Sequence, residues 1–279
     1  MKKVFKALAI LTVAAAAVCG TLAFSACGNS EYTITVGASS TPHAEILENV
    51  VKPILKEEGY KLKVKVIDDY VTPNELLYDG SLDANYFQHN QYLNWFNEEW
   101  NYDLVAVAQV HYEPFSIYSG GKYGSYTGLD DLKSGDVVLV PNDGTNEARA
   151  LLLLQAEGLI TIKENSDLTA LTKEDIDSSS YDFTITEVGA QYCATNIEDA
   201  TISIVNGNYA LQYSLADKYQ VLATEKATDE HVTDYVNVIA ARPDNKDSDK
   251  IQALVDAVLS DDVRTYITNT YGGAVVAVF

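Results

Sequence analysis

Residues 141–150 have the residue types and the spacing that could bind an anion. Residues 136–140 before them are typical of a strand, and the apolar run after them is typical of a helix, which Thr145 could cap through its hydroxyl. Asn146 and Arg149 are three residues apart, so both project from one face of the first helical turn. A guanidinium, an amide and free backbone N–H groups at a helix start favour a carboxylate or a phosphate. An arginine on a solvated helix start explains the pattern equally well.

A second segment, residues 85–93, is rich in aromatic side chains. Phe87, His89 and Tyr92 come where a predicted strand gives way to a helix, which is a usual position for cleft-lining residues in open α/β sheets. Aromatic rings beside one imidazole suit a flat or apolar side chain, including a polarizable thioether. On spacing alone, two core aromatics and a satisfied interior histidine are an equally good interpretation.

Three further residues occupy comparable places. Tyr70 follows a predicted strand, and Asn206 stands at another strand-to-helix step. Asn237 lies within an apolar strand, where its amide is costly unless it finds hydrogen-bond partners. The amino and carboxylate groups of a ligand would provide them, and neighbouring backbone is the alternative.

Strand-like and helix-like segments alternate along the chain, which predicts an α/β fold. We expect two lobes, each a mixed and mostly parallel sheet flanked by helices, with a ligand in the cleft between them, as in periplasmic binding proteins. Extended crossings near residues 111–116 and 231–238 would join the lobes. Lobe 1 would comprise residues 32–112 and 236–279, and lobe 2 residues 113–235.

The first residues predict an exported lipoprotein. Residues 1–26 combine three early lysines with an apolar run too short to span a bilayer, as in a signal peptide. Small residues precede Cys27, which we expect to become the lipidated N-terminus, with residues 27–31 as a tether. Cys19 is a poorer candidate because the bulkier Val18 precedes it. The anchor would hold the protein at the extracytoplasmic face of the membrane.

Composition narrows the partners and the chemistry. The chain has 40 acidic and 19 basic residues, a formal charge of −21, which argues against nucleic acid as a partner. Cys193 has no adjacent base, and no metalloprotease, hydrolase-elbow or phosphate-loop motif is present. The four histidines lack metal-ligand spacing. We therefore predict no catalytic residue, no cofactor and no metal site, and a protein that is not an enzyme.

Taken together, these segments resemble the NlpA lipoprotein family, the methionine-binding lipoproteins that serve ABC importers. The resemblance covers nearly the whole mature chain, and its motifs are specific only in combination. They are residues 41–47 (Thr-Pro-His-Ala-Glu-Ile-Leu), residues 69–75, residues 83–93, residues 140–154 with Thr145, Asn146 and Arg149, residues 206–210 (Asn-Gly-Asn-Tyr-Ala) and residues 235–237 (Tyr-Val-Asn).

The resemblance implies a role for each candidate residue. Arg149 would grip the α-carboxylate of an amino acid, and methionine is the first ligand to expect. Gly144 departs from the family pattern, where proline is common, and Tyr213 stands where small residues are usual. The implied partner is the permease of an ABC importer; a surface adhesin on the same fold, or a secreted hydrolase, is the alternative. Asn146, Asn206 and Asn237 would hold the carboxylate and amino groups, and Tyr70, Phe87, His89 and Tyr92 would surround the side chain.

Overall fold

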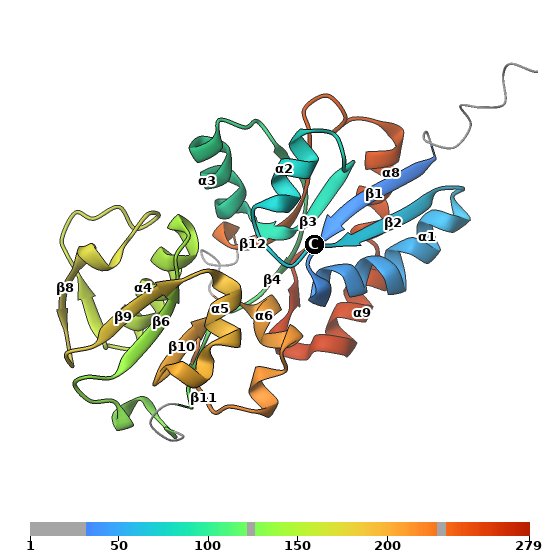
Figure 1. Cartoon of the computed structure of the whole chain (residues 1–279). Coiled ribbons are helices and arrows are strands. Elements are labelled where there is room, and N and C mark those ends of the chain that lie inside the picture. Colours follow the sequence, from blue (N-terminus) through green and yellow to red (C-terminus); the bar gives the residue numbers. More distant parts are fainter. Residues whose placement is uncertain (1–31, 122–125, 228–232) are drawn as a thin grey trace, which may run out of the picture.

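The computed structural model describes residues 32–121, 126–227 and 233–279. The predictions of a signal peptide, a tether and a lipidated Cys27 lie outside these residues. Within the described ranges, no helix is long and apolar enough to cross a membrane. The chain forms two lobes, each with one main β-sheet and helices packed against it (Figure 1).

Lobe 1 is built on a six-stranded mixed sheet in the order β13-β4-β12-β3-β1-β2. β1 is parallel to β2 and β3, whereas β12 is antiparallel to β3 and β4. Two short π-helical segments, Ser40–Ala44 and Leu47–Val51, precede α1. The strands are β1 (Thr33–Ala38), β2 (Lys61–Val66), β3 (Ala84–His89), β4 (Val105–Tyr112), β12 (Val236–Ala241) and β13 (Val276–Ala277), and the helices are α1 (Lys52–Glu57), α2 (Thr72–Tyr78), α3 (Asn90–Trp100), α8 (Asp249–Val258) and α9 (Asp261–Tyr271).

Lobe 2 is built on a five-stranded mixed sheet in the order β11-β5-β10-β6-β9. β6 is parallel to β9 and β10, and β5 is antiparallel to β10 and β11. A separate hairpin of β7 (Ile160–Ile162) and β8 (Ile176–Ser179) follows the first helix. The strands are β5 (Ser116–Ser119), β6 (Val137–Pro141), β9 (Thr184–Val188), β10 (Ile202–Val205) and β11 (Val221–Thr224), and the helices are α4 (Gly144–Ala156), α5 (Ala190–Thr195) and α6 (Gly207–Gln212).

Strand β12 shows why helices cover both faces of its sheet. All six of its residues are buried. Val238 and Ala240 pack in one apolar cluster with residues of α2 and α3, whereas Ile239 and Ala241 pack in another with residues of α1, α8 and α9. Successive side chains of a strand point to opposite faces, so a strand that is apolar throughout needs a helical layer on each side. The predicted α/β fold of two lobes with mixed sheets is confirmed. The expectation that the sheets are mostly parallel is wrong, because antiparallel pairs are as numerous as parallel pairs in lobe 2 and more numerous in lobe 1.

The chain crosses between the lobes twice. Residues 113–115 connect β4 to β5, and residues 225–235 connect β11 back to β12. In lobe 1, Val236 pairs with Tyr112, and in lobe 2, Thr224 pairs with Ser116. Both connections therefore leave each lobe side by side, which is the arrangement of a two-stranded hinge.

Candidate functional site

A cavity lies between the lobes, with about 330 Å³ of space between its lining atoms, part of which is open to solvent. Lobe 1 supplies residues of β3, α3 and β12, and lobe 2 supplies the starts of α4 and α6. Glu113, Phe115, Gln88, Gly207 and Asn208 also line it, although the sequence did not identify them as binding residues. The eight residues predicted to bind a ligand all line this one cavity: Tyr70, Phe87, His89, Tyr92, Asn146, Arg149, Asn206 and Asn237.

The start of α4 is capped by Asp143, which corrects the prediction of Thr145 as the N-cap. Asp143 has an extended backbone, and its Oδ1 accepts a hydrogen bond from the N–H of Asn146 at 3.0 Å. The helix already begins at Gly144, so Thr145 lies inside the first turn and its hydroxyl instead faces Asp143. Carboxylate and hydroxyl side chains both cap helices well, and the start of the helix decides between them.

The same carboxylate orients the amide of Asn146. Asn146 Nδ2 donates to both oxygens of Asp143, at 2.9 and 3.0 Å. Its Oδ1 therefore faces the cavity and accepts from Asn206 Nδ2 at 3.1 Å, while His89 Nε2 lies 3.2 Å away. Burial raises the pKa of Asp143, and hydrogen bonds from Asn146 oppose that shift. One amide thus joins α4, α6 and lobe 1.

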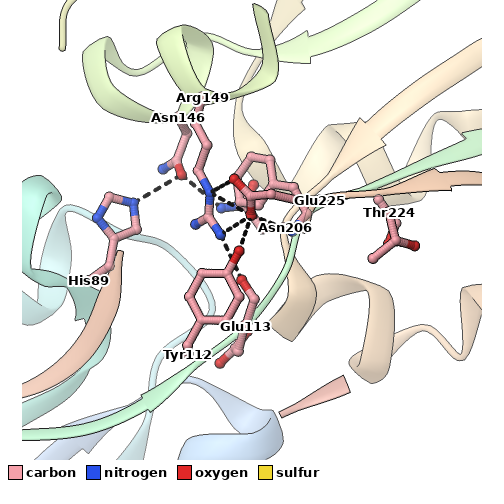
Figure 2. A network of polar contacts seen from close by, with 10 residues as sticks. His89, Tyr112, Glu113, Asn146, Arg149, Asn206, Thr224 and Glu225 are labelled. Atoms are coloured by element: carbon pink, nitrogen blue, oxygen red, sulfur yellow. Dashed lines mark hydrogen bonds and ion pairs between the residues drawn. The ribbon is translucent and has the colours of Figure 1, made fainter. Parts of the chain in front are cut away.

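Arg149 is buried and carries a fully paired edge (Figure 2). Its Nε lies 3.1 and 3.2 Å from the two carboxylate oxygens of Glu225, and its Nη2 donates to Glu225 Oε2 at 2.6 Å and to the carbonyl of Glu113 at 2.7 Å. The guanidinium carbon lies 4.1 Å from the ring centre of Phe115 and 4.2 Å from that of Tyr235. Burial alone would lower the pKa of Arg149, but the charge of Glu225 outweighs burial and raises it.

This pairing changes the expected geometry of the anion site. We predicted a guanidinium fork that a ligand would meet with two hydrogen bonds. Glu225 instead occupies the Nε–Nη2 edge, because a buried guanidinium without a counter-charge is strongly destabilising. Among the described residues, none accepts a hydrogen bond from Nη1 of Arg149, which is therefore the nitrogen left for an anion in the cavity.

His89 is a neutral donor across the lobes. Its Nδ1 accepts a hydrogen bond from the N–H of Tyr92 at 3.0 Å and so caps α3. The ring proton must then lie on Nε2, which donates to Asn146 Oδ1. Burial, with the nearby charge of Arg149, lowers the pKa of His89 to about 3.

Aromatic rings form one part of the cavity wall. The ring centre of Tyr70 lies 5.9 Å from that of Phe87 and 5.8 Å from that of Tyr92. Tyr70 also stacks on Tyr209 of α6 at 5.2 Å, and its hydroxyl donates to Asn208 Oδ1 at 2.6 Å. These contacts join the lobes directly and give the cavity an apolar end.

A buried polar cluster, which we call the Glu113 cluster (Tyr86, His111, Glu113, His43 and Asn237), lies beside the cavity. Tyr86 Oη lies 2.5 Å from His111 Nδ1, and His111 Nε2 lies 2.6 Å from Glu113 Oε1. With the proton on Nε2, His111 accepts from the tyrosine and donates to the carboxylate. His43 Nε2 lies 3.0 Å from Asn237 Oδ1 and 3.6 Å from Glu113 Oε1.

In the Glu113 cluster, the carboxyl group of Glu113 lies beside two histidines that are neutral at neutral pH. Burial lowers the pKa of His111 to about 3 and that of His43 to about 4. Burial also raises the pKa of Glu113, against the opposing effects of His43 and Arg149. A cation beside Glu113 would therefore be stabilised.

His43, His111 and Glu113 are also the described group with ligand atoms close enough together to hold a metal ion. Two ligands of one zinc ion, each about 2.0–2.1 Å from the metal, lie roughly 3.3 Å apart in tetrahedral geometry. The 2.6 Å between His111 Nε2 and Glu113 Oε1 is instead the length of a hydrogen bond. We therefore interpret the group as a hydrogen-bonded network and not as a metal site.

Two departures from the family pattern can now be located. A Cβ at Gly144 would lie 2.7 Å from Nε1 of Trp95, so the glycine makes room for an indole from lobe 1. Tyr213 packs against the apolar cluster around α5 and α6 and does not line the cavity. Cys193 is buried in α5, and burial raises the pKa of its thiol.

Two α/β lobes, two adjacent connections and a polar–aromatic cavity between them define a substrate-binding protein of the periplasmic-binding type. The match to a family model is more specific. The chain belongs to the NlpA lipoprotein family, whose model matches residues 34–279.

Individual relatives extend over nearly the same length. The methionine-binding lipoprotein MetQ of Bacillus subtilis is 36% identical, over 100% of this chain and 99% of that protein. A crystal structure of a putative lipoprotein from Ruminococcus gnavus is 49% identical, with a TM-score of 0.83, over 89% of this chain and 100% of that one. A nutrient-binding protein from Burkholderia cenocepacia, bound to methionine, is 35% identical with a TM-score of 0.81, over 88% and 100% of the two chains.

Proposed function

We propose that this protein binds L-methionine, or a closely related amino acid, and delivers it to an ABC importer. The observation that carries the proposal is the chemistry of the cavity. A cationic guanidinium and a buried carboxylate suit the two charges of an amino acid, and aromatic rings suit an apolar side chain. The names of two relatives, one methionine-binding and one bound to methionine, support this choice of ligand.

The α-carboxylate would meet Arg149 Nη1 together with the amides of the cavity. Asn208 Nδ2 is buried and has no hydrogen-bond partner in the part of the chain that the structure describes, although Asn208 Oδ1 accepts from Tyr70. A buried amide with one unpartnered group is uncommon, and a ligand oxygen would satisfy it. Asn146 would act mainly by orienting its neighbours, since its own amide is already bonded.

The α-ammonium would meet Glu113, with Asn206 Oδ1 and Asn237 beside it. Asn206 Oδ1 is a buried acceptor that has no hydrogen-bond partner among the described residues. A Cβ on Gly207 would lie 2.9 Å from Glu113 Oε2, so the start of α6 lies against this carboxylate. An ammonium would supply both the missing donors and the positive charge that the neutral histidines do not.

The side chain would lie against Tyr70, Phe87 and Tyr92, with His89 at its polar edge. A thioether is polarizable and contacts ring edges favourably, worth roughly 0.3–1.5 kcal/mol for each contact. These three rings already contact one another at centroid distances of 5.8–6.2 Å. They would select the side chain, whereas the charged groups would select the amino-acid backbone.

Transport would use hinged closure around the ligand. We assign residues 32–112 and 236–279 to lobe 1 and residues 113–235 to lobe 2, so that the hinge lies where the described residues 113–115, 225–227 and 233–235 pass between the lobes. A ligand that contacts both lobes stabilises the closed state, which the permease would recognise. A lipid on Cys27, after removal of residues 1–26, would keep the protein at the outer face of the cell membrane. The protein would act without catalysis.

A thermal-shift screen tests this function. The panel comprises the standard amino acids, D-methionine, methionine dipeptides and methionine sulfoxide. A ligand at about 100 times its Kd adds roughly 2.7 kcal/mol to the free energy of unfolding. We expect L-methionine or a close analogue to give the largest increase in Tm. A panel in which no amino acid raises the Tm would refute the proposal.

A further inference from the structure

Glu225 is a buried carboxylate that does not line the cavity, yet it contacts three separate parts of the protein. It is the first residue after β11, where the chain starts back towards lobe 1. Its Oε2 accepts from the hydroxyl of Tyr112 at 2.5 Å, from the N–H of Phe115 at 3.2 Å and from Arg149 Nη2 at 2.6 Å (Figure 2).

The contacts of Glu225 join the two hinge connections. Its own N–H donates to the carbonyl of Phe115 at 2.9 Å, so Glu225 and Phe115 exchange two hydrogen bonds. One residue further out, the hydroxyls of Ser116 and Thr224 lie 3.0 Å apart. Tyr112 belongs to the end of β4 in lobe 1, whereas Arg149 belongs to α4 in lobe 2. One carboxylate therefore connects both lobes at the place where they must rotate.

Glu225 also determines which part of Arg149 faces the cavity. It pairs with the Nε–Nη2 edge, and the rings of Phe115 and Tyr235 lie over the guanidinium at 4.1 and 4.2 Å. The remaining nitrogen, Nη1, is then available to donate to an anion in the cavity. The charge of Arg149 holds the pKa of Glu225 below its ordinary value although burial would raise it, so the pair is charged at neutral pH.

We propose that Glu225 is a positioning residue, which fixes Arg149 for the ligand carboxylate and couples this geometry to the hinge. The inference rests on the proposed function, in which an amino acid binds in the cavity. The alternative is that the carboxylate of Glu225 competes with the ligand carboxylate for the guanidinium of Arg149. The two roles predict opposite effects of removing the charge, so affinity measurements distinguish them.

The test compares Glu225→Gln with the matched control Asp136→Asn. Asp136 is another buried carboxylate of lobe 2, which accepts from the N–H of Lys133 and the hydroxyl of Tyr126 and does not line the cavity. Calorimetry would give the Kd of each variant for L-methionine and for L-methioninamide, which has no carboxylate.

In Glu225→Gln we expect the Kd for L-methionine to rise about tenfold or more, as for a weakened charge-assisted contact. The preference for methionine over its amide should fall with it, whereas Asp136→Asn should keep the wild-type preference. An unchanged or lower Kd for methionine in Glu225→Gln would overturn the proposal. Equal losses for both ligands would also overturn it, because they indicate a general structural defect.

A second measurement does not depend on the ligand. Arg149→Ala removes the guanidinium that Glu225 binds, so the two substitutions break the same contact, and adding Glu225→Gln should lower the Tm by less than it does in the wild-type protein. If the losses of Tm in the two single variants add fully in the double variant, the proposed role of Glu225 in fixing Arg149 is contradicted. Wild-type protein that fails to bind methionine would refute the proposed function, and the Tm comparison would still decide the role of Glu225.

Discussion

Two buried carboxylates lie close to Arg149, and their surroundings differ. Glu225 receives a guanidinium edge, a tyrosine hydroxyl and a backbone N–H, and its pKa lies below the ordinary value because Arg149 outweighs burial. Glu113 faces His111 and His43, which are neutral, and burial raises its pKa. The charge of Glu225 is thus balanced by a cation within the protein, whereas Glu113 accepts hydrogen bonds from neutral groups and forms no ion pair with a lysine or arginine among the described residues. The first suits a structural role, and the second suits a cationic group of a ligand.

Replacing Arg149 should affect both ligand binding and the environment of Glu225. Arg149→Ala removes the cation that would hold the ligand carboxylate and removes the guanidinium that Glu225 binds. We expect a loss of about 2–5 kcal/mol in binding, which is roughly 30-fold or more in Kd. Calorimetry with L-methionine gives the Kd, and the Tm reports the cost of losing the contact between Arg149 and Glu225. Unchanged binding would remove Arg149 from the site.

Glu113→Gln should separate binding from stability. It keeps an acceptor for His111 but removes the negative charge, so we expect the Kd for methionine to rise about 10- to 30-fold. The free energy of unfolding at neutral pH should stay the same or increase, because a raised pKa means that the ionised carboxylate costs stability. Urea unfolding measures it. A large loss of stability would show that the charge is compensated after all.

The pH dependence of binding sharpens the assignment of the ammonium partner. Protonation of Glu113 removes its attraction for a cation, so affinity should fall as the pH drops through its raised pKa, by about tenfold one unit below it. His43 and His111, with pKa values of about 4 and 3, remain neutral in this window. Calorimetry between pH 7 and pH 5, on protein shown to be folded at each pH, measures the effect. If the affinity of Glu113→Gln falls in the same way as the pH is lowered, Glu113 is not the cause of the fall.

Tyr70→Phe should have the smallest effect, at the apolar end of the cavity. The variant keeps the ring but removes the hydrogen bond to Asn208 in the other lobe. Such a bond contributes about 1 kcal/mol, so we expect roughly a fivefold rise in Kd. Tyr78→Phe is a matched control, since Tyr78 is half-exposed in α2 and outside the cavity. A loss as large as that of Arg149→Ala would mean that the closed state depends mainly on this contact.

Local sequence patterns were sufficient to predict many of the helices and strands. The change from strand to helix within residues 85–93 was predicted, and β3 ends at His89 where α3 begins at Asn90. The predicted N-cap of α4 was wrong because Asp143 and Thr145 are both suitable caps, and a helix start two residues earlier selects Asp143. Local sequence preferences do not determine a helix start to within two residues.

Long-range pairs explain what the sequence did not show at the site. Glu225 lies 76 residues from Arg149, in a polar stretch without strand or helix periodicity. His43 lies 194 residues from Asn237. Only the spacing of His111 and Glu113, two residues apart on an extended segment, could have indicated a shared face. The eight predicted residues shared a simpler signal, since all but Asn237 lie around the change from a strand to the next helix, where α/β folds gather their ligand-binding side chains.

The central claim is that the cavity recognises both charges of a free amino acid. Calorimetric titration of the wild-type protein with L-methionine, L-methioninamide and N-acetyl-L-methionine tests it most directly. We predict that methionine binds at least about 100-fold more tightly than either capped analogue, because each leaves a buried charged group without its partner. Equal affinities for the three compounds would contradict the account.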